Sequence, residues 1–355
     1  MGQINMTTKI HTLILAFISI VLFGCTKEQP ISTDTSYNAR ELKWNVDTLT
    51  KSGLWMSGIW GSASNDVYAV GEEQNNNLSG AWHYDGTQWS EITLSNPNGS
   101  SNSDPITLAD VYGFGASDIW IVGYASNPPF NSYAFHYDGK YWTKESLNMT
   151  IAQCIGGRSS TDLDVGGMGG KILHFDGAYW SEDSVSYHIP VESFMFFSFF
   201  SIIKTSSSNL YANALLHNNS TGVDTRYLFT NNSKVWQLVD SSVAPESYML
   251  KIWLSPSQQL YGSGLGIFRW TGSGWTAIHN NDPVYSYLNI FGTADDNIFV
   301  TGDGGKFENY NGVDWYQYPN MNNPSNSYMG GWTDGKEVFV ISIATGVSTI
   351  YHGRQ

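Results

Sequence analysis

The sequence predicts an all-β protein, a seven-bladed β-propeller built of four-stranded antiparallel blades. One unit recurs along the chain, its spacing suits a propeller blade, and no segment has the apolar period of a helix. The clearest copy runs from Gly61 to Trp89 and contains GSASNDVYAVG and then HYDGTQW. Its Asp85-Gly86 pair between apolar runs is a strong hairpin signal, because Gly takes the positive φ of a tight turn. The strand Val67–Val70 is expected to stop at Gly71.

Seven copies of this unit are visible in the chain. Tryptophans open the outer strands about 45 residues apart, the length of a propeller blade; they are Trp44, Trp89, Trp142, Trp180, Trp236, Trp275 and Trp315. The hairpin before the tryptophan is plainest at Asp85-Gly86, Asp138-Gly139 and Asp176-Gly177. In these copies Asp is predicted to cap the turn, Gly to take positive φ, and Trp to pack between blades.

A second turn precedes the second strand of every copy. Its polar residues are Asp66, Asp118, Asp162, Asn209, Gln259, Asn297 and Glu337. An aliphatic residue follows each of them, and then usually an aromatic residue. The third copy differs, because Leu163 is followed by Asp164, and that unit is degenerate.

The two ends of the chain predict how the ring closes. The last copy ends at Tyr351–Arg354, just where a tryptophan-bearing outer strand should follow. Such a strand, Lys43–Val46 with Trp44, stands alone near the start. We therefore expect the N-terminal strand to complete the last blade, since radial closure leaves only short sheet edges. The propeller domain is predicted to span residues 41–355.

The first 24 residues have the order of an export signal. Lys9 ends a basic region, an apolar run follows, and Leu22–Cys25 reads LFGC. This order resembles a bacterial lipoprotein signal, which implies a lipid on Cys25. The alternatives are an ordinary signal peptide and a transmembrane anchor, although an anchor needs about 18 or more apolar residues. Residues 25–40 are polar and are predicted to be a flexible tether. The expected location is the bacterial cell envelope, lipid-anchored at the outer membrane, on its periplasmic or its surface face.

Charge and cysteine content narrow the possible partners. The formal net charge of −14 and the lack of a basic cluster argue against nucleic acid. With Cys25 bound to lipid, Cys154 has no disulfide partner and is predicted to be a buried free thiol. No cofactor is predicted, and the domain is expected to be monomeric.

Three histidines occupy one repeat position in successive copies: His83, His136 and His174. Three histidines can bind zinc. Their strand is the third from the axis, however, and strands lie about 4.8 Å apart, so equivalent positions are too distant to share an ion. A hydrogen-bonded structural position between blades is expected, and no metal site is predicted.

The repeat WGSASNDVYAVG and HYDGTQW resembles that of bacterial exported propeller proteins, many of them lipoproteins, over about residues 43–354. The hairpin also distantly resembles the Asp-box of sialidases, although Asp85 and Trp89 lie four residues apart where that motif has five. A sialidase would imply an arginine triad and a Tyr–Glu nucleophile pair. The five arginines of the mature chain assemble into no clear triad; they are Arg40, Arg158, Arg226, Arg269 and Arg354.

Other glycosidases need two facing carboxylates. Most carboxylates are assigned to the repeated turns; those singled out elsewhere include Asp110, Asp282, Asp303 and Glu308, and no pairing can be read between them.

Tight and variable connections alternate along each meander, so the variable ones share one face, here called the variable-loop face. Function in such scaffolds usually lies on long loops. The predicted ligand-binding residues are Tyr187, His188, Tyr248, Tyr285, Tyr287 and Tyr328. Aromatic rings suit stacking on a sugar or a protein anchor. The run Phe194–Phe200 has a second interpretation, as the apolar start of the fourth inner strand. The sequence thus predicts a non-catalytic, membrane-tethered binding or scaffold protein whose ligand is a glycan or an envelope protein, with a surface glycoside-cleaving enzyme as the alternative.

Overall fold

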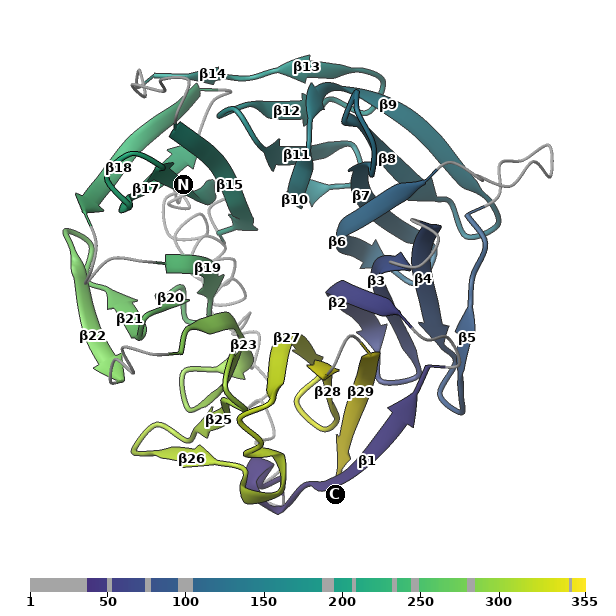
Figure 1. Ribbon diagram of the computed structural model, residues 1–355, viewed down its shortest axis with the longest axis vertical. Coiled ribbons are helices and arrows are strands. Elements are labelled where there is room, and N and C mark those ends of the chain that lie inside the picture. Colours follow the sequence, from purple (N-terminus) through teal and green to yellow (C-terminus); the bar gives the residue numbers. More distant parts are fainter. Residues whose placement is uncertain are drawn as a thin grey trace, which may run out of the picture. The chain divides into compact units, whose positions relative to one another are not determined.

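The computed structural model describes residues 37–49, 53–73, 78–94, 105–186, 195–205, 209–231, 235–243, 249–279, 285–344 and 347–355. A compact unit spans Asn38–Gln355 and so begins slightly ahead of the expected boundary at residue 41. It consists of seven sheets that follow one another around a ring in chain order (Figure 1). In the described part of the chain the helices are two short 3-10 turns, η1 (Ala39–Glu41) and η2 (Pro319–Met321). No helix there has the length and apolar character needed to cross a membrane.

Each sheet is an antiparallel meander whose first strand is innermost, and the sheets are called blades 1 to 7. Blade 1 contains β2 (Leu54–Ala63), β3 (Asp66–Glu73), β4 (Leu78–Tyr84) and β5 (Trp89–Glu91). Blade 2 contains β6 (Ile106–Gly115), β7 (Asp118–Ala125), β8 (Asn131–Tyr137) and β9 (Trp142–Thr150). Blade 3 contains β10 (Ala152–Ser159), β11 (Asp162–Gly167), β12 (Ile172–Phe175) and β13 (Trp180–Glu182).

The fourth blade carries an extra strand. It contains β15 (Met195–Lys204), β16 (Leu210–Asn218), β17 (Val223–Asn231) and β18 (Val235–Val243), with β14 (Ser184–Val185) added parallel to β18. Blade 5 contains β19 (Met249–Leu254), β20 (Leu260–Gly264), β21 (Ile267–Trp270) and β22 (Trp275–His279). Blade 6 contains β23 (Tyr287–Ala294), β24 (Asn297–Gly302), β25 (Phe307–Tyr310) and β26 (Trp315–Gln317).

The N-terminal strand completes blade 7, which confirms the predicted closure. Blade 7 contains β27 (Asn326–Thr333), β28 (Val338–Ala344), β29 (Val347–Arg354) and β1 (Lys43–Thr48). Trp44 stands opposite Gly353 in the β1–β29 pair. Its ring meets Phe307 and Tyr318 of the preceding blade edge-on, with centroids 5.2 and 5.3 Å away. The closing strand is therefore held by its own sheet and by blade 6.

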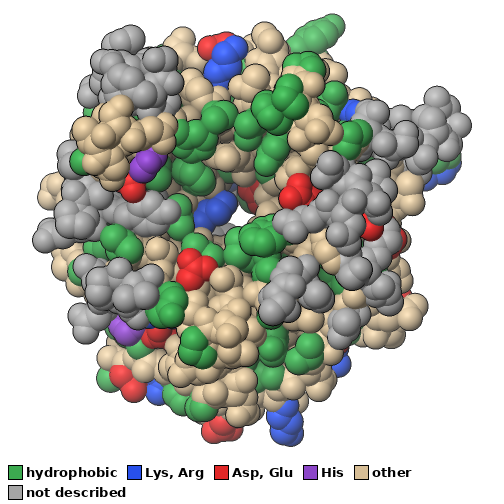
Figure 2. Space-filling view, in the orientation of Figure 1, with side chains coloured by type: hydrophobic (Ala, Val, Ile, Leu, Met, Phe, Trp, Pro, Cys, Tyr) green, Lys and Arg blue, Asp and Glu red, His purple; other side chains and the backbone are tan. Residues whose placement is uncertain are grey.

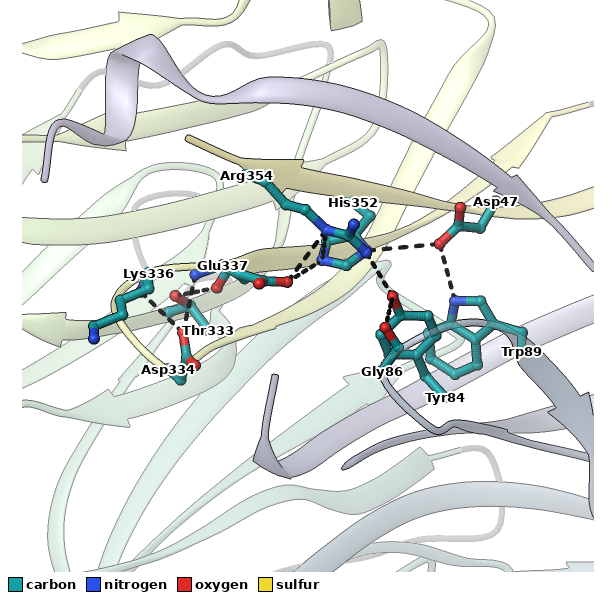
Figure 3. Close-up of polar contacts among 10 residues, drawn as sticks. All are labelled: Asp47, Tyr84, Gly86, Trp89, Thr333, Asp334, Lys336, Glu337, His352 and Arg354. Carbon is teal, nitrogen blue, oxygen red and sulfur yellow. Dashed lines mark hydrogen bonds and ion pairs between the residues drawn. The ribbon is translucent and has the colours of Figure 1, made fainter. Parts of the chain in front are cut away.

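Polar side chains connect the closing strand to blade 1 (Figure 3). The indole of Trp89 donates to Asp47 Oδ2 at 3.1 Å, and Arg354 Nη2 donates to the hydroxyl of Tyr84 at 2.5 Å. A hydrogen bond with His352 lowers the pKa of the Asp47 carboxyl below its ordinary value. The first and last strands of the chain are thus bonded to the same neighbouring blade.

The Asp-Gly hairpins cap themselves. Asp85 Oδ1 accepts the hydroxyl of Thr87 at 2.6 Å and the backbone N–H groups of Gln88 at 2.9 Å and of Thr87 at 2.8 Å, and these bonds lower the pKa of Asp85 to about 2. Gly86 has φ +92°, and a Cβ there would lie 2.7 Å from Cβ of Asn65 in the other tight turn. Equivalent bonds form at Asp138 and Asp176, followed by Gly139 and Gly177 at φ +90° and +93°. The two kinds of tight turn therefore pack against each other.

The repeated tryptophans pack across blade boundaries. The ring of Trp180 in blade 3 meets Trp120 of blade 2 edge-on, with centroids 6.0 Å apart, and its Nε1 donates to Glu145 of blade 2 at 2.6 Å. Trp142 is buried between blades 1 and 2 among apolar side chains of both. The contact surface between neighbouring blades forms most of the hydrophobic core.

Candidate functional site

The candidate site is the variable-loop face with the central channel that opens on it. The connections β3–β4 and β7–β8 and the links between blades lie on this face, and the capped turns lie on the opposite one. The inner strands β2, β6, β10, β15, β19, β23 and β27 surround the centre of the ring (Figure 1). Figure 2 shows a hollow at this centre, with side chains of both charge signs near its rim.

Every inner strand carries a β-bulge, near its start in six blades and in the middle of β15 in blade 4. The extra residues are Ser57, Ala109, Gln153, Phe200, Leu250, Leu288 and Met329. A bulge bends its strand and re-aims the side chains around it. The inner strands thus share one irregular position that is repeated in each blade.

Gly71, which ends the VYAVG run, lies beside the bulge of the inner strand β2. The prediction that it stops the strand is wrong. Strand β3 continues through Gly71 to Glu73. A Cβ on Gly71 would lie 2.1 Å from the carbonyl oxygen of Trp55, and one on Gly123 would lie 2.4 Å from that of Thr107. Only glycine allows the inner strand to approach so closely.

Polar side chains next to the bulges bond one blade to the next. Asp110 Oδ2 accepts the backbone N–H of Ile155 at 3.2 Å, and Lys251 Nζ donates to the carbonyl of Phe200 at 2.7 Å. Burial raises the pKa of Asp110, and the positive charge of Lys251 opposes that rise. These charges near the channel therefore hold neighbouring inner strands together.

Cys154 lies beside the same bulge in β10. It is fully buried and free, as predicted, and burial raises the pKa of its thiol to about 12. A thiol with this pKa is protonated at neutral pH, so it lacks the thiolate that a nucleophile requires.

Glu308 lies in a polar cluster between blades 5 and 6 and is itself buried. Its Oε1 accepts the hydroxyl of Tyr287 at 2.8 Å, and its Oε2 lies 2.6 Å from His279 Nε2. Burial raises the pKa of Glu308, but the bond and charge of His279 outweigh it, so the pKa is lowered overall. Tyr287 is only 1% exposed. Its predicted role as a ligand contact is therefore corrected, because both its ring and its hydroxyl are engaged inside the protein.

The other predicted tyrosines differ in their placement. Tyr328 is 0% exposed and donates its hydroxyl to the carbonyl of Met321 at 2.8 Å, so it too belongs to the core and its predicted ligand contact is corrected. Tyr285 is half-buried, with its ring against Gly304. The remaining predicted site residues, Tyr187, His188, Tyr248 and Cys25, lie outside the described residues.

Phenylalanines of the Phe194–Phe200 run belong to the fourth inner strand. Strand β15 begins at Met195, and Phe197 and Phe199 are buried in the core of blade 4. The second interpretation of this run, as the apolar start of an inner strand, is confirmed for these two side chains.

Two exposed aromatic side chains on the variable-loop face were not predicted. Trp55 is 39% exposed at the start of β2, and Phe130 is 37% exposed in the β7–β8 connection. When the copies are aligned on their bulges, Trp55 differs from the residue that several other copies have at the same position. The equivalent residues of blades 2, 4, 6 and 7 are Thr107, Ser198, Ser286 and Ser327. Blades 3 and 5 have Ile151 and Tyr248 at this position. The exposed tryptophan of blade 1 therefore departs from the small hydroxyl residue that four of the copies share.

The repeated histidines bond within their own blades, not between blades as expected. His83 Nε2 lies 2.7 Å from Asp66 Oδ1, and His136 Nε2 lies 2.9 Å from Asp118 Oδ1. Each bond connects the third strand to the turn that precedes the second strand. The polar turn residues of the repeat are therefore partners of these histidines.

No protein-family model and no curated protein sequence matches this chain. Several solved structures share its fold. One is YCF48 bound to D1 peptide, with 14% identity and a TM-score of 0.62 over 90% of this chain and 98% of that one. Another is a catalytically inactive virginiamycin B lyase from Staphylococcus aureus with quinupristin, with 16% identity and a TM-score of 0.63 over 89% of this chain and 100% of that one. A puromycin hydrolase matches with 10% identity and a TM-score of 0.54 over 85% of this chain and 56% of that one. These similarities show a β-propeller, in agreement with the seven sheets described above.

Proposed function

We propose that this chain is a non-catalytic binding or scaffold protein of the bacterial cell envelope, tethered to the membrane by lipid on Cys25. Its ligand is an envelope protein or a glycan bound on the variable-loop face. One observation carries the binding role in this proposal. The reactive side chains at the inner strands are bonded within the fold, whereas aromatic side chains on the same face, Trp55 and Phe130, are exposed. Exposed aromatic rings are typical anchors in binding surfaces.

The same bonds weigh against a glycoside-cleaving enzyme. A sialidase-like reaction needs a Tyr–Glu pair that reaches substrate, and the pair Tyr287–Glu308 is buried. Asp303 Oδ1 accepts a hydrogen bond from Ser327 at 2.8 Å, and Asp282 lies outside the described residues. Three arginines form ion pairs with aspartates: Arg40 with Asp314, Arg158 with Asp162 and Arg226 with Asp240.

A protein ligand has support from the fold comparison as well, since YCF48 was solved with a bound peptide. The lyase and the hydrolase show that propellers of this shape also include enzymes. The experiment must therefore separate binding from turnover.

We would incubate the purified full chain with a panel of envelope polysaccharides and with envelope proteins, and measure binding and product release together. Binding without product is expected. Trp55→Ser should weaken binding more than about tenfold, or about 1.4 kcal/mol. Tyr179→Ser is the matched control, because Tyr179 is 76% exposed on the opposite, tight-turn face. Product release would favour the glycosidase, and a loss of binding in Tyr179→Ser alone would move the site to the other face.

The tether is tested separately, by mass spectrometry of the N-terminal peptide. Cleavage before Cys25 and a diacylglyceryl group on its sulfur are expected from the order of residues 1–25. An intact, unmodified peptide over residues 1–30 in the membrane fraction would exclude lipid anchoring.

A further inference from the structure

Blade 3 departs from its neighbours at one position of the repeat. In three blades, an aromatic ring of the second strand stacks on the histidine opposite it. The pairs are Tyr68–His83, Trp120–His136 and Phe339–His352, with ring centroids 4.4, 4.0 and 3.8 Å apart. In blade 3 the residue opposite His174 is Asp164. A carboxylate thus takes the place of the stacking ring.

The carboxylates of blade 3 converge on the histidine. Asp164 Oδ1 lies 3.3 Å from His174 Nδ1, and Asp162 Oδ1 lies 3.9 Å from the same nitrogen. One ligand atom from each of the three residues lies within 4.8 Å of the others. A tetrahedral Zn²⁺ with bonds of about 2.0–2.2 Å holds its N and O ligands about 3.3 Å apart. The three atoms therefore need only small side-chain movements to bind one ion.

The carboxylate of Asp164 has an unsatisfied oxygen. The side chain is 0% exposed, and no hydrogen-bond donor of the described residues reaches its Oδ2. A buried carboxylate without full hydrogen bonding is costly unless a cation accompanies it. At this position blade 3 has a carboxylate, whereas blades 1, 2 and 7 have an aromatic ring.

We propose that Asp162, Asp164 and His174 bind one divalent transition-metal ion of the Zn²⁺ class. Two carboxylates and an imidazole suit Zn²⁺, with solvent as the fourth ligand on the exposed side of Asp162. Ca²⁺ and Mg²⁺ prefer all-oxygen sites and are poor candidates. The ion would connect β11 to β12 and so replace the ring stack of the other blades. The site lies within one blade and does not depend on the proposed ligand-binding function.

Arg158 acts as counter-ion to this cluster when no metal is bound. Its Nη1 lies 2.8 Å from Asp162 Oδ1 and 3.9 Å from Asp164 Oδ2. A metal ion must displace this guanidinium from Asp162, so the two cations compete. Removal of the arginine charge is therefore expected to tighten metal binding. If Arg158 were the permanent cation of the cluster, its removal would destabilise the fold and create no metal affinity.

The test is equilibrium dialysis of the full chain, stripped with EDTA, against Zn²⁺, with bound metal counted by mass spectrometry. We expect about one Zn²⁺ per chain at micromolar free ion. Asp164→Asn and His174→Gln should weaken binding by more than about tenfold, and Arg158→Gln should strengthen it. His83→Gln is the matched control, because it alters the same repeat position in blade 1 and should leave Zn²⁺ binding unchanged.

Thermal unfolding supplies a second measurement. Zn²⁺ should raise the melting temperature of the wild type and of His83→Gln, since a ligand that binds only the native state stabilises it. It should not raise that of Asp164→Asn. If Asp164→Asn fails to fold, Asp162→Asn replaces it, because Asp162 is partly exposed. The proposal is overturned if the wild type binds no Zn²⁺, or if it binds equally well with His174 or with Asp162 and Asp164 substituted.

Discussion

The two faces of the ring are built on different principles. On the tight-turn face, Asp85, Asp138 and Asp176 make the same bonds in successive blades, and the glycine after each takes the same positive φ. On the variable-loop face, features such as Trp55 and Phe130 occur once. Repeated residues therefore serve the closed ring, and function is to be sought among residues that break the repeat. Tyr287 and Tyr328 also break the repeat, but they are buried. A candidate functional residue must therefore be exposed as well.

The closure of the ring should give the largest effect on stability. Trp44→Ala removes the ring that contacts Phe307 and Tyr318 and loosens the strand that completes blade 7. Aromatic truncation in cores costs about 3–5 kcal/mol, and a cost of about 3 kcal/mol is expected for this partly buried ring. Urea or thermal unfolding of the full chain measures it.

A deletion of residues 26–36 is the control for Trp44→Ala. It leaves Asn38, which caps η1, and the ion pair of Arg40 with Asp314 in place. Little change in the melting temperature is expected. Equal losses from the two changes would mean that the closing strand β1 adds no more stability than residues 26–36, contrary to the observed pairing of β1 with β29.

Glu308→Gln should have the next largest effect, because it weakens bonds to both His279 and Tyr287. Hydrogen bonds to a buried charged group are worth about 1.5–3 kcal/mol, so a loss of about 2 kcal/mol at neutral pH is expected. The pKa of Glu308 in the folded protein is lowered below 4.5. Its contribution is therefore complete above pH 4.5 and is lost as the pH falls through the folded pKa.

Melting temperatures of wild type and Glu308→Gln across the acid range measure this effect. The difference between the two proteins should shrink as the pH falls below 4.5. A difference that stays constant, or grows in acid, would show that the charge of Glu308 does not stabilise the fold.

The tight-turn packing should give a smaller effect. Gly86→Ala and Gly272→Ala place a Cβ at nearly the same angle, φ +92° and +93°. The new Cβ meets Asn65 at 2.7 Å in the first case and nothing within 4 Å in the second. Left-handed backbone strain costs about 1–2 kcal/mol per residue and is common to both. Gly86→Ala should therefore melt lower than Gly272→Ala, and equal melting temperatures would show that contact between the two turns adds no stability.

Features that depend on the local sequence could be predicted, whereas features that depend on tertiary contacts could not. The Asp-Gly turns and the missing last strand are local features, so blade number and closure could be predicted. The need for glycine at Gly71 arises from the bulge of a neighbouring strand, and only the paired backbones reveal it. Burial of Tyr287 and Tyr328 depends on how the next blade packs, which no pattern within one copy contains. The partner of His83 was visible as the turn residue Asp66, but the pairing needs the strand register.

Substitutions of exposed aromatic residues on the two faces should affect stability least. They are therefore the best substitutions with which to test function. Trp55→Ser and Tyr179→Ser both alter exposed side chains, and exposed substitutions usually change stability by no more than about 0.5 kcal/mol. Both variants are therefore expected to melt close to the wild type. With stability matched, any difference in ligand binding between them reports contact with the ligand and not loss of fold. A melting temperature for Trp55→Ser as low as that of Gly86→Ala would instead place Trp55 among the structural residues, and the variable-loop face would lose its best candidate anchor.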